Sequence, residues 1–218
     1  MSHLNQQTLL LFATVIFVPA VFLHLTRKNT AAVRLYIIQS SAIALLLGLS
    51  VLDRFSPLLL VAVVATVAVK IFIAPYFFFG LIRRHELKFS VNTYLNTPVS
   101  LLVIAALLAL TQSDFFETLA VLAQSSEASL SLCFSTILIS LFLTINRKGA
   151  LSQMIGILSL ENGIVAFALF AGLEQSPGLQ LGVTFNILIW VVIATVFASM
   201  IFRKFGSLDV TSMKKLRG

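Results

Sequence analysis

Seven long apolar runs follow one another along almost the whole chain, and they constrain its fold more than any other feature. A helix needs about 20 mostly apolar residues to cross the hydrocarbon core of a bilayer. The fourth run is the shortest, and we expect its helix to include residues 94–97 as well. The pattern predicts an all-α integral membrane protein with seven transmembrane helices, at residues 7–25, 34–52, 57–82, 98–111, 128–145, 152–172 and 178–202.

Composition excludes an ordinary soluble domain. The chain is 59% hydrophobic and 11% charged, and its mean hydropathy is +1.03, whereas soluble domains carry about 25% charged residues. Arg27 and Lys28 follow the first run, with no small-residue cleavage pattern, so we interpret that run as a retained helix and not as a signal peptide. We expect a multi-pass protein of a bacterial or archaeal plasma (inner) membrane, surrounded by the lipid bilayer.

Basic residues mark alternate connections between the runs. All of the 15 basic residues except Arg54 and Lys70 follow the first, third, fifth or seventh run. The other three connections contain five acidic residues, Asp53, Asp114, Glu117, Glu127 and Glu174. Basic loops stay in the cytoplasm, so the N-terminus is predicted outside and the C-terminus in the cytoplasm. This pattern accounts for the net charge of +7 without nucleic acid as a partner.

The chain divides at an acidic stretch, residues 111–129, with four predicted helices before it and three after it. Residues 1–125 are therefore predicted to form a four-helix N-terminal membrane region, and residues 126–218 a three-helix region. The connections are too short for a catalytic domain outside the membrane. No repeat with a period of 20–50 residues is present, as it would be in a repeat protein.

Two charged residues, Lys70 and Glu161, lie well inside predicted helices. Placing a charge at the bilayer centre costs about 2.5–3.5 kcal/mol on insertion scales, and such residues often mark an ion or proton path. Lys70 lies 13 residues before Arg83, and Glu161 lies 13 residues after Lys148. At about 1.5 Å per residue, both are about 20 Å from the basic end. They can therefore pair, either in a proton path or as a packing contact.

Polar residues near these charges extend the candidate site. Ser159 and Asn162 flank Glu161, and Asn186 lies in the seventh run. Gln-Ser-Ser, residues 39–41, lies about two turns into the second run. Single amides and hydroxyls in membrane helices commonly bond between helices, so that role stays open beside a place in a proton path.

Pro75 follows Lys70 in the stretch VKIFIAPYFFF. Proline has no backbone N–H and clashes with the carbonyl four residues earlier, so we predict a helix kink at Pro75. The carbonyl that loses its donor suits a hydrated relay beside Lys70.

No catalytic centre is evident in the chain. His3, His24 and His85 are far apart, and Cys133 is the single cysteine. There is no glycine loop for phosphates, no Cys or His cluster for iron–sulfur or haem, and no nucleophile–base pattern. We therefore predict no catalytic residue, metal or cofactor here, and any catalysis would take place in a partner subunit.

Three short motifs carry a resemblance to a known family: AVKIFIAP at 68–75, LENG at 160–163 and GSLDV at 206–210. With the helix count, they resemble component E of hydrogenase-4. The C-terminal half is similar to the K subunit of complex I and to the C subunit of multisubunit cation/proton antiporters. Lys70, Pro75 and Glu161 match the component E pattern. Asn186 and Trp190 stand where these families have a carboxylate in the last helix, so a partner would supply the second carboxylate.

The resemblance implies a membrane subunit of a complex I-like or group 4 hydrogenase-like proton-translocating assembly. It would lie beside a large antiporter-like subunit and other membrane-arm subunits, with Glu161, Lys70, Asn162 and Asn186 in a proton path. The alternative is a structural packing subunit of a multisubunit cation/proton antiporter or ion transporter. A further alternative is an autonomous seven-helix transporter.

Overall fold

The computed structural model describes residues 5–53, 55–87, 89, 93–113, 126–173 and 176–209. These residues form helices and no β-strand. The helices are α1 (Gln6–Leu25), α2 (Asn29–Asp53), α3 (Pro57–Val67), η1 (Ala68–Ile73), α4 (Ala74–Arg84), α5 (Thr97–Thr111), α7 (Glu127–Asn146), α8 (Ala150–Phe170) and α9 (Pro177–Phe205). The elements α3, η1 and α4 follow one another without a break, as one long helix.

Six of these helices are long and apolar enough to cross a membrane: Gln6–Leu25, Asn29–Leu52, Pro57–Arg84, Glu127–Asn146, Ala150–Phe170 and Pro177–Phe205. The chain is thus an all-helical, multi-pass membrane protein. The fourth predicted run forms α5, which has 15 residues. A helix of that length reaches about 22 Å, less than the roughly 30 Å of a bilayer core. The count of seven spanning helices and the direction of insertion stay predictions.

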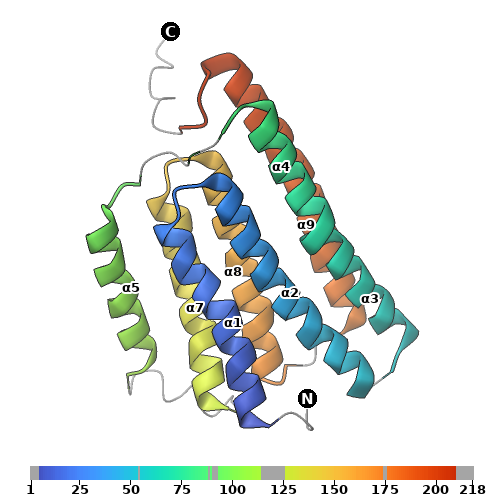
Figure 1. The fold of residues 1–218 in the computed structure, drawn as a ribbon. Helices are drawn as coiled ribbons and strands as arrows, with labels where there is room; N and C mark the ends of the chain where they lie inside the picture. Colours follow the sequence, from blue (N-terminus) through green and yellow to red (C-terminus); the bar gives the residue numbers. More distant parts are fainter. Residues whose placement is uncertain are drawn as a thin grey trace.

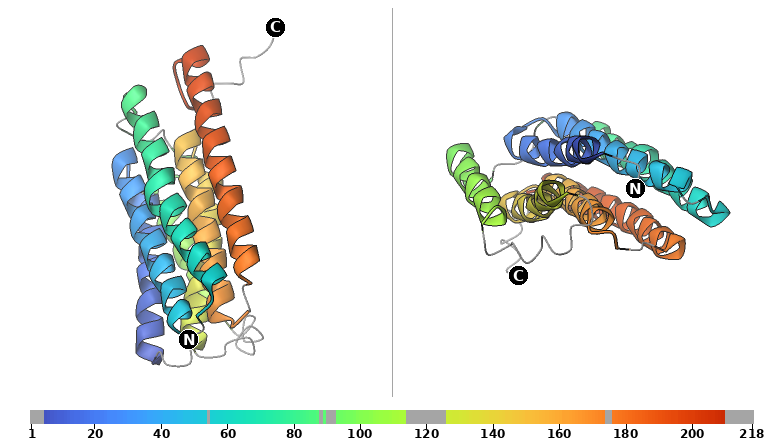
Figure 2. Two further views of the ribbon diagram at one scale, coloured as in Figure 1. Left: turned by 90° about the vertical axis from the view of Figure 1, so that its right-hand side faces the viewer. Right: turned by 90° about the horizontal axis from the view of Figure 1, so that it is seen from below.

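The bundle has two layers, seen end-on in Figure 2. One layer contains α1, α2 and the long helix α3–η1–α4, and the other contains α7, α8 and α9. Across the layers α1 packs on α7, α2 on α8 and α3 on α9. Helix α5 lies at one edge and contacts α7 and α1 (Figure 1).

The two regions predicted from the sequence share one interior. One apolar cluster joins Tyr36 and Phe78 to Leu158 of α8 and Val191 of α9. Most of the acidic stretch that separates the two regions in sequence lies outside the described residues. Within the described part, the N- and C-terminal helices pack along their length as one bundle.

Local sequence sets where several helices begin. The side chains of Asn5, Asn96 and Ser176 accept hydrogen bonds from backbone N–H groups in the first turns of α1, α5 and α9. Such N-caps satisfy donors that have no partner within the helix. At the other end of α9, Gly206 adopts a φ of 68° and closes the last turn. Glycine suits this left-handed position because it has no Cβ.

Helices α7 and α8 pack closely through small residues. A Cβ on Gly156 would lie 2.6 Å from Thr144 Oγ1 and 3.2 Å from its backbone nitrogen. A Cβ on Gly163 would lie 3.2 Å from the backbone nitrogen of Ile137. Between these glycines the hydroxyls of Ser140 and Ser159 are 2.8 Å apart. Small residues allow close backbone approach in lipid, where packing replaces the hydrophobic drive. We call this contact the small-residue interface.

The four basic connections meet at one end of the bundle, the upper end in Figure 1. The side chain of Asn29 donates to the carbonyls of Leu87 and Phe89, which links the first connection to the segment after α4. Isolated backbone bridges link the connections further: Lys28 with Phe89, Thr93 with Arg147, and Gly149 with Asp209. The charge alternation read from the sequence thus corresponds to one physical end of the protein, which we call the basic end.

Candidate functional site

Lys70 lies in a π-helical turn, η1, between α3 and α4. The N–H of Ala74 bonds to the carbonyl of Val69, five residues earlier. Turns of this kind are rare in proteins, and those that do occur are often found at functional sites. Pro75 follows directly and has no N–H to donate. The regular α geometry therefore gives way just before the proline, while the predicted kink of the helix axis stays a prediction.

Lys70 and Glu161 form a buried ion pair between η1 and α8. Lys70 is 2% exposed, and its Nζ lies 2.5 Å from Glu161 Oε2. Nζ also donates to Asn162 Oδ1 at 2.9 Å. Two consecutive residues of α8 therefore contact one ammonium group, Glu161 as its ion-pair partner and Asn162 as a hydrogen-bond acceptor. A charge removed from water is tolerated when it has a partner and further hydrogen bonds, and Lys70 has both.

Asn162 extends this contact to the first two helices. Its Nδ2 lies 3.0 Å from Ser40 Oγ and 3.3 Å from Gln39 Oε1. Gln39 in turn donates to the carbonyl of Ile16 at 2.9 Å. Each of these polar side chains is fully buried. We call the set Lys70, Glu161, Asn162, Gln39 and Ser40 the polar network; it links η1, α8, α2 and α1.

The Glu161 carboxylate is less satisfied than its neighbours. Its Oε1 is buried and makes no hydrogen bond within the described part of the chain. An ionised carboxylate has about four acceptor sites, and Lys70 uses only Oε2. Tyr36, one turn before Ser40, is fully buried and within electrostatic range of Glu161. Within the polar network, Glu161 is therefore the side chain whose hydrogen-bonding capacity is least used.

Asn186 lies away from these groups. It is on the exposed side of α9 and makes no hydrogen bond to the polar network. The inward side of α9 instead presents Thr184, whose hydroxyl lies 3.1 Å from that of Thr66 on α3. The sequence reasoning did not identify this pair, because an all-apolar helix shows no periodic signal for its inner face. The structure brings Lys70, Glu161 and Asn162 together and leaves Asn186 outside.

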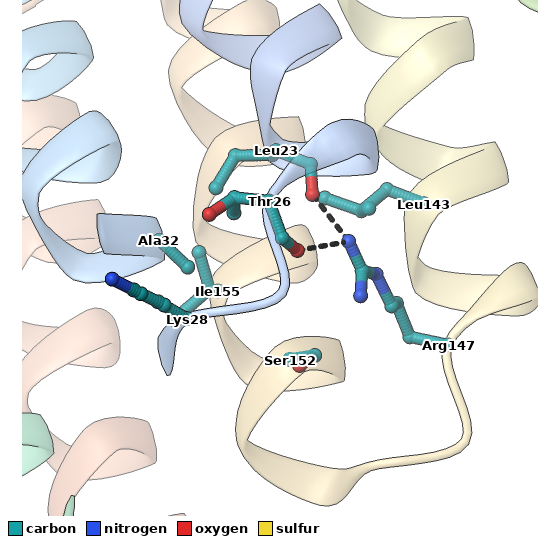
Figure 3. A pocket seen from close by; sticks show the side chains of 8 residues that line it. All are labelled: Leu23, Thr26, Lys28, Ala32, Leu143, Arg147, Ser152 and Ile155. Atoms are coloured by element: carbon teal, nitrogen blue, oxygen red, sulfur yellow. Dashed lines mark hydrogen bonds between the residues drawn. The ribbon is translucent and has the colours of Figure 1, made fainter. Parts of the chain in front are cut away.

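A second buried cation lies at the basic end, in the small pocket shown in Figure 3. Arg147 is 4% exposed, and its Nη2 donates to the carbonyls of Leu23, His24 and Thr26 at 2.6, 3.0 and 2.9 Å. These carbonyls are the negative end of the α1 dipole. Burial lowers the pKa of Arg147, and the nearby charge of Arg27 lowers it further.

Arg147 therefore fixes α1 to the connection between α7 and α8. The charge pattern had indicated only a cytoplasmic loop residue there. No sequence signal distinguishes this arginine from the exposed Arg27 and Lys28 of the basic end, because its role depends on where α1 ends.

The fold and the site define a multi-pass helical membrane protein with a buried Lys–Glu pair. No family model and no solved structure matches the chain. The chain is 32% identical over 228 aligned residues to Uncharacterized protein Rv0085 of Mycobacterium tuberculosis (strain ATCC 25618 / H37Rv), and the match covers all of both chains. The chain belongs to the same family as that protein.

Proposed function

We propose that this chain is a membrane subunit of a complex I-like or group 4 hydrogenase-like proton-translocating assembly, of the component E type. Its role is to contribute part of an intramembrane proton path. The observation that carries the proposal is the Lys70–Glu161 pair, which is buried in apolar helices and connected to Asn162. Ionisable residues at this depth are costly, and in membrane proteins they commonly serve ion or proton movement.

The geometry supports a proton step at the carboxylate. Lys70 holds Glu161 Oε2, while the buried Oε1 has no hydrogen-bond donor among the described residues. Interactions between charges are strong in a low-dielectric interior. A change of charge in a neighbouring subunit would therefore shift the balance between an ionised and a protonated Glu161. Asn162 keeps Lys70 oriented in both cases.

The proposal includes the placement of the chain in its membrane. The basic end faces the cytoplasm, and the N-terminus is outside. Helix α5, extended by the residues before it, also crosses the membrane, which brings the number of spanning helices to seven. The membrane is the plasma membrane of a bacterium or archaeon. A large antiporter-like subunit is the main partner, and it supplies the second carboxylate of the path.

The test is Glu161→Gln in the assembled complex, reconstituted into vesicles. Glutamine keeps the size of the side chain but cannot release a proton, so proton translocation per assembled complex should fall by about a hundredfold or more, the lower end of the range for a positioned proton-transfer group. Glu127→Gln is the matched control, because Glu127 lies in the first turn of α7. Unchanged translocation in Glu161→Gln would refute the relay role.

One observation favours a second candidate, a structural packing subunit of a multisubunit antiporter or ion transporter. The polar network links four helices through side-chain hydrogen bonds, as a packing device would. In that case Glu161→Gln reduces the amount of assembled complex, whereas the rate per complex stays at the wild-type value. Measuring assembly and rate on the same preparation separates the two functions.

A further inference from the structure

The outward side of α9 carries a repeat of seven residues. Seven exposed positions follow one another at alternating spacings of three and four residues. They are Leu179, Gly182, Asn186, Ile189, Ile193, Val196 and Met200. This spacing keeps a stripe on one side of a helix and is the pattern through which two helices pack side by side. We call it the α9 stripe.

The stripe has no partner within the described part of the chain. The opposite side of α9, with Thr184, Ile187 and Val191, is buried against the bundle. Helix α9 ends one layer of the bundle, at the edge away from α5 (Figure 2). It is also the least buried of the six spanning helices. The stripe therefore faces lipid or another chain.

Asn186 decides between these two surroundings. It is the single hydrogen-bonding side chain in the stripe, nine residues after Pro177 and thus about 14 Å along the helix. An amide that faces hydrocarbon without a partner loses its hydrogen bonds to water. One turn earlier, a Cβ on Gly182 would meet nothing within 4 Å, so the backbone is open to close approach. The amide therefore favours contact with a second helix over contact with lipid, and Gly182 leaves room for that helix.

We propose that the α9 stripe binds α9 of a second copy of this chain, with the two Asn186 side chains hydrogen-bonded to each other. An amide carries both a donor and an acceptor, so Asn186 is complementary to itself. All copies share one orientation in a membrane, which makes the two helices parallel about a two-fold axis along the membrane normal. In coiled coils, a single Asn at such a position specifies the register and the number of helices that pair.

Cysteine cross-linking in membranes tests the contact. The native Cys133 is buried, so a new cysteine on the stripe is the reactive one. Ile189→Cys should form a disulfide between two differently tagged copies on oxidation with copper phenanthroline. The control is Ile164→Cys, which is exposed on α8 near the depth of Glu161. We expect at least about tenfold more linked product for Ile189→Cys, because linkage requires Cα atoms within about 7 Å.

Asn186→Leu tests the chemistry of the contact. It keeps the helix and the apolar surface but removes the amide, so association between fluorescently tagged copies diluted in lipid should weaken about five- to thirtyfold. Phe185→Leu changes the exposed neighbour and keeps the amide, so it should associate as the wild type does. Equal association of Asn186→Leu and wild type would refute the proposal. So would cross-linking of Ile189→Cys to a different protein in place of the second copy.

Discussion

Helix α8 packs in two different ways on its two sides. Toward α7 it presents Gly156, Ser159 and Gly163, which form the small-residue interface. Toward η1 and α2 it presents Glu161 and Asn162, which belong to the polar network. Because lipid supplies little hydrophobic drive between helices, each side needs another source of attraction. One side uses close packing, and the other uses charge and hydrogen bonds.

The difference matters for what each side can do. The small-residue interface has one favourable distance and contains no group that titrates near neutral pH. The polar network contains a carboxylate and an ammonium group whose attraction depends on their protonation. Helix α8 is therefore held firmly on one side, while the other side responds to charge. Under the proposed function, this asymmetry would let the subunit remain assembled while a proton moves.

The largest effect is expected for Lys70→Met. It leaves Glu161 buried without its counter-ion, which typically costs about 3–5 kcal/mol. The Glu161 side chain keeps 19% exposure, so we expect about 3 kcal/mol, at the lower end of that range. Reversible unfolding of the purified protein in mixed detergent micelles measures this free energy.

The double variant Lys70→Met with Glu161→Leu is the control for that loss. It removes both charges, and apolar replacements of a buried pair are often neutral or stabilising, so most of the lost stability should return. If the double variant is as unstable as Lys70→Met, the stability was lost through packing and not through the unpaired charge. The attraction between Lys70 and Glu161 would then not be what holds this side of α8.

A smaller loss is expected for Gly156→Ala in the small-residue interface. The new Cβ would lie too close to Thr144, and overpacking costs about 1–3 kcal/mol in the free energy of unfolding. Gly48→Ala is the matched control, because a Cβ at Gly48 meets nothing within 4 Å. Alanine should stabilise that helix by up to about 1 kcal/mol. Equal effects at the two glycines would show that α7 and α8 do not pack closely.

The smallest effect is expected for His85, the residue after α4. It belongs neither to the small-residue interface nor to the polar network. Its Nε2 is 2.8 Å from Ser199 Oγ. Burial, followed by the charges of Arg84 and Arg203, holds the pKa of His85 below 6.5. Below pH 6.5 the unfolded chain binds a proton that the folded protein does not, so stability falls as the pH drops toward the lowered pKa.

His85 should therefore account for a fall in melting temperature of only about 1 °C between about pH 7.5 and about pH 5.5, because it is partly exposed. The difference between the wild type and His85→Gln over this range measures that share. The pH dependence that persists in His85→Gln belongs to other groups, such as the buried His24. Identical pH profiles for the wild type and His85→Gln would contradict the prediction.

Helix positions followed closely from the sequence. Apolar runs of membrane length, interrupted by polar or basic residues, gave α1, α2, the long helix Pro57–Arg84 and the three C-terminal helices to within a few residues. The equal distances of Lys70 and Glu161 from basic ends also anticipated their common depth. These inferences succeeded because the rise per residue and the bilayer thickness are fixed lengths.

The partners of the candidate site could not be obtained in this way. Asn186 was expected beside Glu161 and lies on the outward side of α9, while Gln39 and Ser40 of α2 bind Asn162. A helix that is apolar on all sides has almost no periodic signal, so its rotation about its own axis cannot be read from the pattern.

By itself the sequence determined that the chain is a bundle of apolar helices with two charges at one depth. Only the tertiary structure decided that α3 packs on α9 and α2 on α8, that a π turn presents Lys70, and that Arg147 closes the end of α1. The physical reason is that hydropathy and charge act along the membrane normal, which the sequence samples directly. Packing between helices acts in the membrane plane, where side-chain shape and hydrogen bonds choose the neighbours.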